Sequence, residues 1–232
     1  MTRPGDIARS LAFYVAFYGG TFVFVVAALV MLPISKGAFR WLSESWSGWH
    51  RWCVVHLLGI EVRVEGVQPP GSVLFAIKHE SFFEAIDMPN LLSWPGVFAK
   101  AELLRIPMWG YVGRLYGLIE VQRDQGAKAL RAMLASAKAI TAQGRPLAIF
   151  PEGTRVPHGQ VRELQAGFAG LYKLLGLPVV PVAVNSGALY HRRWKRRGTI
   201  IVRFGEVIPP GLPRDEVEAR VQAAINQLNT PA

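Results

Sequence analysis

Apolar residues form one long unbroken run near the start of the chain. Residues 11–34 contain no charged side chain, and the run exceeds the roughly 20 apolar residues that a helix needs to cross a bilayer. A cleavable signal peptide usually has a shorter apolar core and a small-residue cleavage site, which is not evident here. The run therefore predicts a membrane helix, which either crosses the membrane once or turns back within one leaflet at Gly19-Gly20 or Pro33.

The next segment, residues 36–58, mixes polar residues with four of the seven tryptophans of the chain: Trp41, Trp46, Trp49 and Trp52. Tryptophan prefers the headgroup level of a membrane. The pattern therefore predicts an interfacial helix beside the membrane helix. Packing of its aromatic face on the domain that follows it is the alternative.

After Gly59 the pattern changes to short β-branched runs separated by helical stretches. The predicted strands are residues 60–64, 73–77, 97–99, 118–121, 147–150, 179–184 and 199–204. The predicted helices are residues 82–92, 107–116, 127–143, 166–175 and 214–228. Strands and helices that take turns imply an α/β fold with a mainly parallel sheet flanked by helices. We therefore expect a membrane-embedded helical segment at residues 1–59 and an α/β domain at residues 60–232.

Charge and composition narrow the class of partner. Lys and Arg number 26 against 16 Asp and Glu, which gives a net charge of +10, and 51% of the residues are hydrophobic. A basic surface attracts anions, and the apolar content favours anionic membrane lipid over nucleic acid. Five cations and Trp194 lie within residues 192–197, which fits lipid headgroups.

The single cysteine, Cys53, excludes an intrachain disulfide and is typical of a small buried hydrophobe.

Side chains that could bind a ligand or take part in a reaction follow several predicted strands. In open α/β sheets, ligands bind beyond the carboxyl ends of the strands. The residues in question are Lys78-His79, Lys100, Arg123, residues 151–155 and Asn185-Ser186. We therefore expect one crevice that gathers a histidine, carboxylates and cations. No metal is expected, because His50 and His56 have no partner at a ligand spacing and are interpreted as packing or interfacial residues.

His79 and Glu84 form the first candidate pair. A neutral imidazole can act as a base near physiological pH. Two residues five positions apart differ by about 140° around a helix axis, so they meet only if His79 lies in the loop and Glu84 in the first helical turn. Ser81 to Glu84 has the form of a capping box, so capping alone is the alternative role of Glu84, with Asp87 as the reserve partner of His79. Glu80 is expected to be solvated.

The block Phe150-Pro151-Glu152-Gly153-Thr154-Arg155 is the second candidate. Gly153 lets the backbone approach a ligand, and the planar guanidinium of Arg155 suits a phosphate. A plain Pro-Glu-Gly turn with a surface Glu–Arg pair is the alternative.

Taken together, these blocks resemble the glycerolipid acyltransferase family, whose bacterial members act as 1-acyl-glycerol-3-phosphate acyltransferases. The resemblance covers roughly residues 73–187. It rests on His79 followed by Glu84, on Lys100-Ala101-Glu102-Leu103 with Pro107 and Gly110, on residues 117–123, on residues 150–155, and on Val180-Pro181-Val182-Ala183-Val184. The chain departs from the family in having Glu84 where aspartate is usual and Lys78 where asparagine is frequent, which leaves the exact geometry open.

The resemblance implies acyl transfer from a thioester to the free hydroxyl of a lysophospholipid. His79 would remove the hydroxyl proton while Glu84 orients it, and Lys100 or nearby N–H groups would stabilise the oxyanion. Arg123 and Arg155, with Glu152, Gly153 and Thr154, would bind the acceptor. Acyl-CoA or acyl carrier protein would bring the acyl group, without a further cofactor. The site would face the cytoplasm at the inner membrane.

Three other functions remain open at this point. The acceptor could be another lysolipid, such as a lyso-ornithine lipid. The chain could bind membrane lipid without catalysis, although such a protein would have no use for the His79–Glu84 pair. A serine hydrolase would need a G-x-S-x-G elbow, and the sequence has none.

Overall fold

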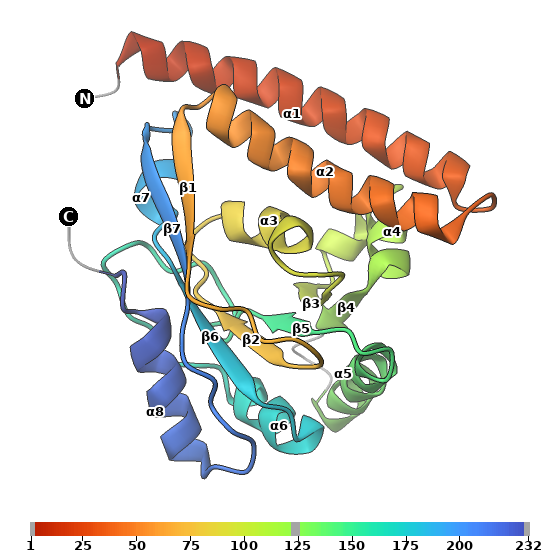
Figure 1. The fold of residues 1–232 in the computed structure, drawn as a ribbon, viewed down its shortest axis with the longest axis vertical. Coiled ribbons are helices and arrows are strands. Elements are labelled where there is room, and N and C mark those ends of the chain that lie inside the picture. Colours follow the sequence, from red (N-terminus) through yellow and green to blue (C-terminus); the bar gives the residue numbers. More distant parts are fainter. Residues whose placement is uncertain (1–2, 122–125, 230–232) are drawn as a thin grey trace.

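The computed structural model describes residues 3–121 and 126–229, which form an α/β fold around one mixed sheet (Figure 1). The strand order is β1-β7-β6-β2-β5-β3-β4. The strands are β1 (Ile60–Glu65), β2 (Leu74–Ile77), β3 (Gly96–Lys100), β4 (Leu118–Val121), β5 (Leu147–Ile149), β6 (Val179–Val184) and β7 (Gly198–Phe204). All neighbouring strands are parallel except β6 and β7. The predicted fold class is therefore confirmed.

Helices cover both faces of this sheet. They are α1 (Pro4–Met31), α2 (Lys36–His56), α3 (Phe83–Leu91), α4 (Trp109–Tyr116), α5 (Gly126–Thr141), α6 (Ala166–Leu175), α7 (Gly187–Tyr190) and α8 (Arg214–Ile225), with a 3-10 turn η1 (Leu103–Arg105). In Figure 1, α1, α2 and α3 lie on one side of the sheet, and α5, α6 and α8 lie on the other.

The two faces of β2 show how the sheet separates two apolar clusters. Side chains alternate across a strand, so Phe75 and Ile77 pack with α1, α2 and α3, whereas Leu74 and Ala76 pack with α5, α6 and α8. All four are fully buried. Because both faces are covered, the strands read as continuous apolar runs, as parallel sheets do.

Helix α1 is continuous through Gly19-Gly20, so the expected bend does not occur there. A Cβ on Gly20 would lie 2.1 Å from the indole nitrogen of Trp49, so glycine serves close packing of α1 on α2. The chain turns instead after Met31, and Ser35 caps α2 by accepting a hydrogen bond from the Ala38 N–H. Within the described residues, α1 alone is long and apolar enough to cross a membrane.

The tryptophans of α2 divide into two groups. The Trp46 indole N–H donates to Thr21 Oγ1 at 3.0 Å and that of Trp49 to the Ala16 carbonyl at 3.2 Å, so both face α1. Trp41 and Trp52 are exposed. Trp46 also contacts the Trp109 ring of the α/β domain, so packing describes part of this segment. The interfacial interpretation stays a prediction for Trp41 and Trp52. Cys53 is fully buried in the apolar core, as predicted.

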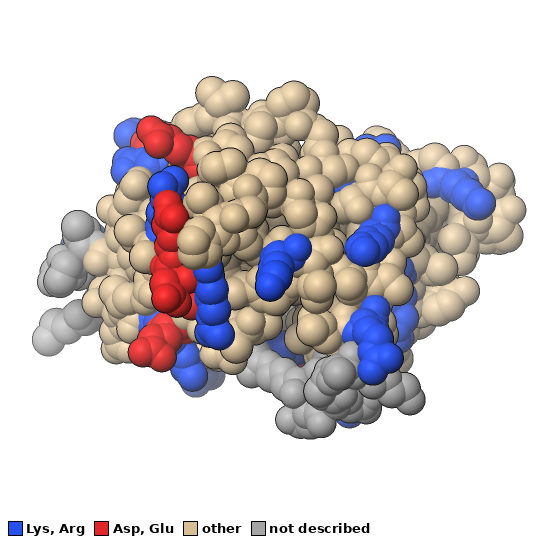
Figure 2. Space-filling model, turned by 90° about the horizontal axis from the view of Figure 1, so that it is seen from below, with Lys and Arg blue, Asp and Glu red and all other residues tan. Residues whose placement is uncertain are grey.

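The surface away from α1 and α2 is unevenly charged. Figure 2 shows this face, with acidic side chains gathered in a row toward the side of α8 and large uncharged areas elsewhere. On α8 itself, Arg214 pairs with Glu218 and Arg220 with Glu216. The three acidic residues of α8 outnumber its two arginines, so the excess positive charge lies in other parts of the molecule.

Candidate active site

The β2–α3 loop, residues 78–82, places His79 directly beyond the carboxyl end of β2. His79 Nδ1 lies 2.9 Å from Glu84 Oε1, and Glu84 is in the first turn of α3. The same oxygen accepts the backbone N–H groups of Glu80 and Ser81 at 2.7 and 2.6 Å. Glu84 therefore caps the helix start and contacts His79 at once, so the two roles considered from the sequence coexist.

The second oxygen of Glu84 is held by two hydroxyl groups. Ser186, just beyond β6, lies 2.6 Å from Oε2 and Ser81 lies 3.1 Å from it. Burial alone would raise the pKa of Glu84, but the hydrogen bonds from His79, Ser186 and the loop backbone lower it below the usual 4.5. An ionised carboxylate only accepts hydrogen bonds. Nδ1 of His79 therefore carries its proton, and Nε2 is the nitrogen that can accept one.

Ser186 is a site residue to which the sequence assigned no role. The sequence places it at a strand end, but a lone serine after a strand has many uses. Its Oγ also lies 2.7 Å from Ser81 Oγ, and it is fully buried. Only the fold brings it to Glu84, which lies 102 positions earlier.

The β5–α6 loop, residues 150–165, lies against the β2–α3 loop. The Phe150 ring stacks on the His79 ring with 4.1 Å between centroids. The backbone N–H of Val156 donates to the His79 carbonyl at 2.7 Å. Gly153 has a φ of +68°, a region that favours glycine, so the turn in this loop requires it.

Glu152 and Lys78 form a fully buried ion pair. Lys78 Nζ lies 2.6 Å from Glu152 Oε1, and the other Glu152 oxygen accepts the His79 N–H at 3.3 Å. Both side chains have no exposed surface. Glu152 was expected to bind substrate, but its side chain points inward, because a buried ammonium group needs a charged partner. Its carboxylate is thus committed to the β2–α3 loop.

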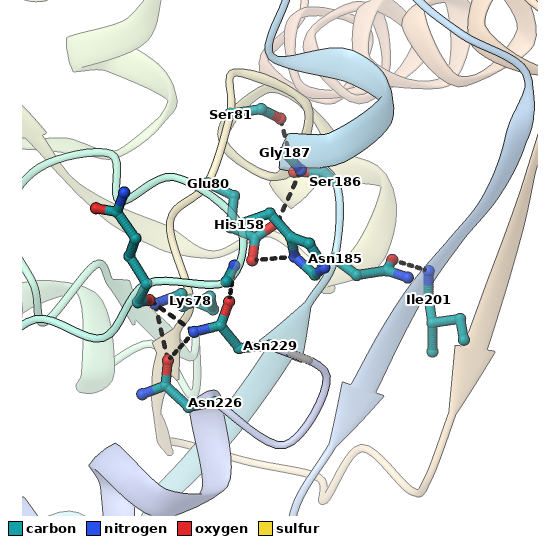
Figure 3. Close-up of polar contacts among 12 residues, drawn as sticks. Lys78, Glu80, Ser81, His158, Asn185, Ser186, Gly187, Ile201, Asn226 and Asn229 are labelled. Carbon is teal, nitrogen blue, oxygen red and sulfur yellow. Dashed lines mark hydrogen bonds and ion pairs between the residues drawn. The ribbon is translucent and has the colours of Figure 1, made fainter. Parts of the chain in front are cut away.

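The expectation that Glu80 is solvated is wrong. Glu80 is fully buried, with Oε1 2.9 Å from His158 Nδ1 and Oε2 accepting the Gly187 N–H at 2.8 Å (Figure 3). Burial raises the pKa of Glu80, although the bond from His158 opposes this.

Asp87, the reserve partner expected for His79, is not available to it. Its carboxylate oxygens accept hydrogen bonds from Nε and Nη2 of Arg51, which joins α3 to α2. Ser47 strengthens this contact by donating to the Ile86 carbonyl at 2.8 Å. The helix that carries Glu84 is thus fixed to the N-terminal helices.

His79 borders an apolar cavity of about 1480 Å³ between α1, α4, α6 and the sheet. Lys100, at the end of β3, Gly153 and Arg155 border the same cavity. Arg155 is exposed, and its guanidinium lies 4.1 Å from the centre of the Phe82 ring. Thr154 is half-buried, and Arg123 lies outside the described residues. The structure thus brings His79, Lys100, Gly153 and Arg155 around one cavity, as expected from the strand ends.

Part of the basic segment 192–197 also borders this cavity, through Arg192, Arg193 and Lys195. Lys195 is buried rather than exposed, with Nζ 4.0 Å from the centre of the Tyr190 ring, and burial lowers its pKa to about 8. Arg192 and Arg193 remain exposed. The segment packs on α1, because the Lys195 N–H donates to Ser10 Oγ and the Tyr14 hydroxyl donates to the Arg193 carbonyl.

In residues 3–121 and 126–229, no three His, Cys, Asp or Glu side chains are placed so that they could hold a metal ion. His50 belongs to an aromatic cluster instead. Its Nε2 lies 2.9 Å from the Tyr190 hydroxyl, and its ring contacts Phe13, Phe17 and Phe83. It is a packing residue, as predicted.

Known proteins resemble this chain in sequence and in fold. The chain is 29% identical over 225 residues to the 1-acyl-sn-glycerol-3-phosphate acyltransferase of Pseudomonas aeruginosa, which covers 94% of this chain and 86% of that one. It is 29% identical over 218 residues to the human 1-acyl-sn-glycerol-3-phosphate acyltransferase alpha, covering 89% and 76%. The crystal structure of the 1-acyl-sn-glycerophosphate acyltransferase PlsC from Thermotoga maritima has the same fold, with a TM-score of 0.76 at 21% identity over 98% of this chain and 99% of that one. The family model described as Acyltransferase matches residues 59–185, so the chain belongs to the acyltransferase family.

Proposed function

We propose that this protein transfers an acyl group from a thioester to the free hydroxyl of 1-acyl-glycerol-3-phosphate, which gives phosphatidic acid. The observation that carries the proposal is the His79–Glu84 pair at the edge of a large apolar cavity that Arg155 also borders. The apolar walls suit acyl chains, and the arginine suits a phosphate. The names of the relatives from Pseudomonas aeruginosa and human support the same acceptor.

His79 acts as the general base in this proposal. Nε2 accepts the proton of the acceptor hydroxyl while the oxygen attacks the thioester carbonyl carbon. When the tetrahedral intermediate collapses, the C–S bond breaks, and the sulfur leaves as a thiol with the proton that His79 returns. Glu84 holds Nδ1–H throughout and stabilises the imidazolium. The base acts on the acceptor itself, so no acyl-enzyme forms.

Lysine and arginine side chains carry out the remaining tasks. Lys100, or N–H groups near it, stabilises the negative charge that develops on the thioester oxygen. Arg155 and Arg123 bind the acceptor phosphate, with the backbone at Gly153 and the Thr154 hydroxyl beside it. Glu152 contributes by holding the loop rather than by touching the substrate. The reaction uses acyl-CoA or acyl carrier protein as the donor and no further cofactor or metal.

The protein is expected to work at the cytoplasmic face of the inner membrane, where these donors are found. Large side chains on α1 are exposed, including Val15 at 77% and Phe22 at 65%, and lipid covers such side chains best. Arg192 and Arg193, beside the N-terminal half of α1, would attract anionic headgroups. The cavity would then open where a lysophospholipid already resides.

A panel of acceptors tests the proposal. The full-length protein in mixed micelles is supplied with acyl-CoA or acyl carrier protein and with lysophosphatidic acid, lysophosphatidylcholine or a lyso-ornithine lipid, and His79→Ala serves as the inactive control. We expect kcat/KM to be highest for lysophosphatidic acid, and transfer to require His79. Preferential acylation of the lyso-ornithine lipid would assign another acceptor. Undiminished transfer by His79→Ala would refute the mechanism.

A further inference from the structure

We infer that Lys78 is a positioning residue, whose buried ion pair with Glu152 fixes His79 relative to the loop that carries Arg155. The inference rests on the proposed function, because it assumes that His79 and Arg155 act on the same acceptor. Lys78 precedes His79, and its side chain is fully buried.

The three hydrogens of the Lys78 ammonium group all have acceptors. Nζ lies 2.6 Å from Glu152 Oε1, 2.9 Å from Asn226 Oδ1 and 3.2 Å from the Gln160 carbonyl. Three donors with three acceptors saturate the group, which leaves the side chain no other arrangement that keeps its bonds. Lys78 therefore joins the end of β2 to the β5–α6 loop and to the end of α8.

The same carboxylate connects this lysine to the base. One Glu152 oxygen binds Lys78 Nζ, and the other accepts the His79 N–H. The His79 carbonyl accepts the Val156 N–H one residue beyond Arg155. His79 is thus held at both its backbone groups by the segment that presents Arg155.

Two asparagines near the end of α8 form hydrogen bonds with the network that holds the β5–α6 loop (Figure 3). Asn229 Nδ2 donates to the Gln160 carbonyl at 2.6 Å, and Asn229 Oδ1 accepts the Gly159 N–H. Asn229 Nδ2 also lies 3.2 Å from Asn226 Oδ1, the same oxygen that accepts from Lys78. On the other side of His79, the Glu80–His158 pair joins the two loops once more. The separation of the base and Arg155 is therefore set by directional bonds.

Stability alone does not account for a charged pair at this position. Well-packed apolar residues often replace a buried ion pair without loss of stability, whereas removal of one partner leaves a costly unpaired charge. Oriented hydrogen bonds do what apolar contacts cannot, because they fix the direction of the His79 N–H. A reacting group misplaced by about 1 Å can lose roughly 10²-fold in rate, so the position of this loop matters for turnover.

The test compares Lys78→Met, Glu152→Gln and the double variant in the full-length protein. Steady-state kinetics give kcat and both KM values, and thermal unfolding reports stability. Each single variant leaves a buried group without its partner and should lose stability. The double variant should regain stability, because no unpaired charge remains, yet its kcat should stay about 10- to 100-fold below wild type with an unchanged donor KM.

A purely structural role predicts the opposite result for the double variant. Its kcat would return to the wild-type value together with its stability, and that outcome would overturn the inference. Arg203→Met, which breaks the exposed Arg203–Glu65 pair between β7 and β1, is the matched control and should leave kcat unchanged. His79→Ala in the same series tests the proposed base separately. If that variant stayed active, the proposed base would be refuted. If it were inactive while the double variant regained full kcat, only the role of Lys78 would be refuted.

Discussion

The two loops around His79 and the α1–α2 pair are built on opposite principles. Around His79, the charged side chains Lys78, Glu80, Glu84 and Glu152 are all fully or almost fully buried and hydrogen-bonded. Between α1 and α2, aromatic side chains meet, such as Phe17 of α1 and His50 of α2, whose ring centroids are 5.0 Å apart. The outer face of α1 exposes large apolar side chains.

The difference reflects what each kind of contact can fix. Hydrogen bonds weaken steeply with distance and angle, so a buried polar network specifies atomic positions. Apolar burial depends on area and has no direction, so it stabilises a helix pair that meets a fluid surface. Hydrogen bonds therefore fix atomic positions in the loops around His79, where the reaction is proposed. Buried apolar area stabilises the α1–α2 pair, where lipid is expected.

The largest expected effect comes from Glu84. Glu84→Ala removes the acceptor for His79 Nδ1 and for two loop N–H groups, so we expect kcat to fall by about 10²- to 10⁴-fold. Glu84→Asp should keep part of the activity, since its carboxylate is one methylene short of His79. Steady-state kinetics on folded protein check both, and equal loss in the two variants would mean that a carboxylate one methylene shorter cannot orient His79 at all.

The contribution of Glu84 to the stability of the folded protein should decrease as the pH falls. Its pKa is lowered in the folded protein, so its contribution to stability is present above about 4.5, the usual value, and disappears as the pH falls through the folded value. Unfolding measured between pH 7 and pH 3 should therefore show a smaller loss for Glu84→Gln than for wild type.

The next effect concerns α1. Phe13 is 1% exposed and contacts Phe17, His50 and Tyr190, so Phe13→Ala should cost about 3–5 kcal/mol of unfolding free energy. Val15→Ala on the exposed side of the same helix should change it by less than about 0.5 kcal/mol. Denaturation in detergent compares the two, and similar losses would contradict the division of α1 into two faces.

Arg155 should show a smaller, kinetic effect. Arg155→Ala removes charged hydrogen bonds worth about 1.5–3 kcal/mol, so the acceptor KM should rise by roughly ten- to a hundredfold. The donor KM should change little. The reverse pattern would assign Arg155 to the phosphates of the acyl carrier.

The smallest effect is expected for the exposed cations. Replacement of Arg192 or Arg193 by Ala should weaken binding to anionic vesicles by about 1 kcal/mol each, and the difference should shrink as salt is added. Vesicle sedimentation at several salt concentrations measures it. Binding that ignores both mutation and salt would leave adsorption to α1 and the exposed tryptophans.

Local patterns predicted the strands well and the buried charges poorly. The seven β-branched runs lie within two residues of the observed strands, and His79 and Glu84 are close enough in sequence to be read as a pair. Lys78 and Glu152 are 74 residues apart, and Glu80 and His158 are 78 apart. Hydrophobic periodicity says nothing of such pairs, so Glu80 was expected in solvent and Glu152 at the substrate.

Two other features could not be predicted from local patterns. Trp46 and Trp49 differ from Trp41 and Trp52 only in the side of α2 that they occupy, and composition alone cannot separate them. Helix α7 has four residues, fewer than a periodic pattern needs to be recognised. Its Gly187 N–H nevertheless completes the hydrogen bonding of Glu80.

The contacts of α1 with the basic segment also bear on how the chain folds during synthesis. The Tyr14 hydroxyl meets the Arg193 carbonyl across 179 positions, and Ser10 meets Lys195 across 185. At about 5–20 residues per second of translation, α1 waits roughly 10–40 seconds for these partners. During that interval Phe13, on the inner face of α1, lacks its contact with the Tyr190 ring, and lipid could cover it. The bilayer would therefore cover apolar side chains of α1 during synthesis, before the folded protein meets its substrate there.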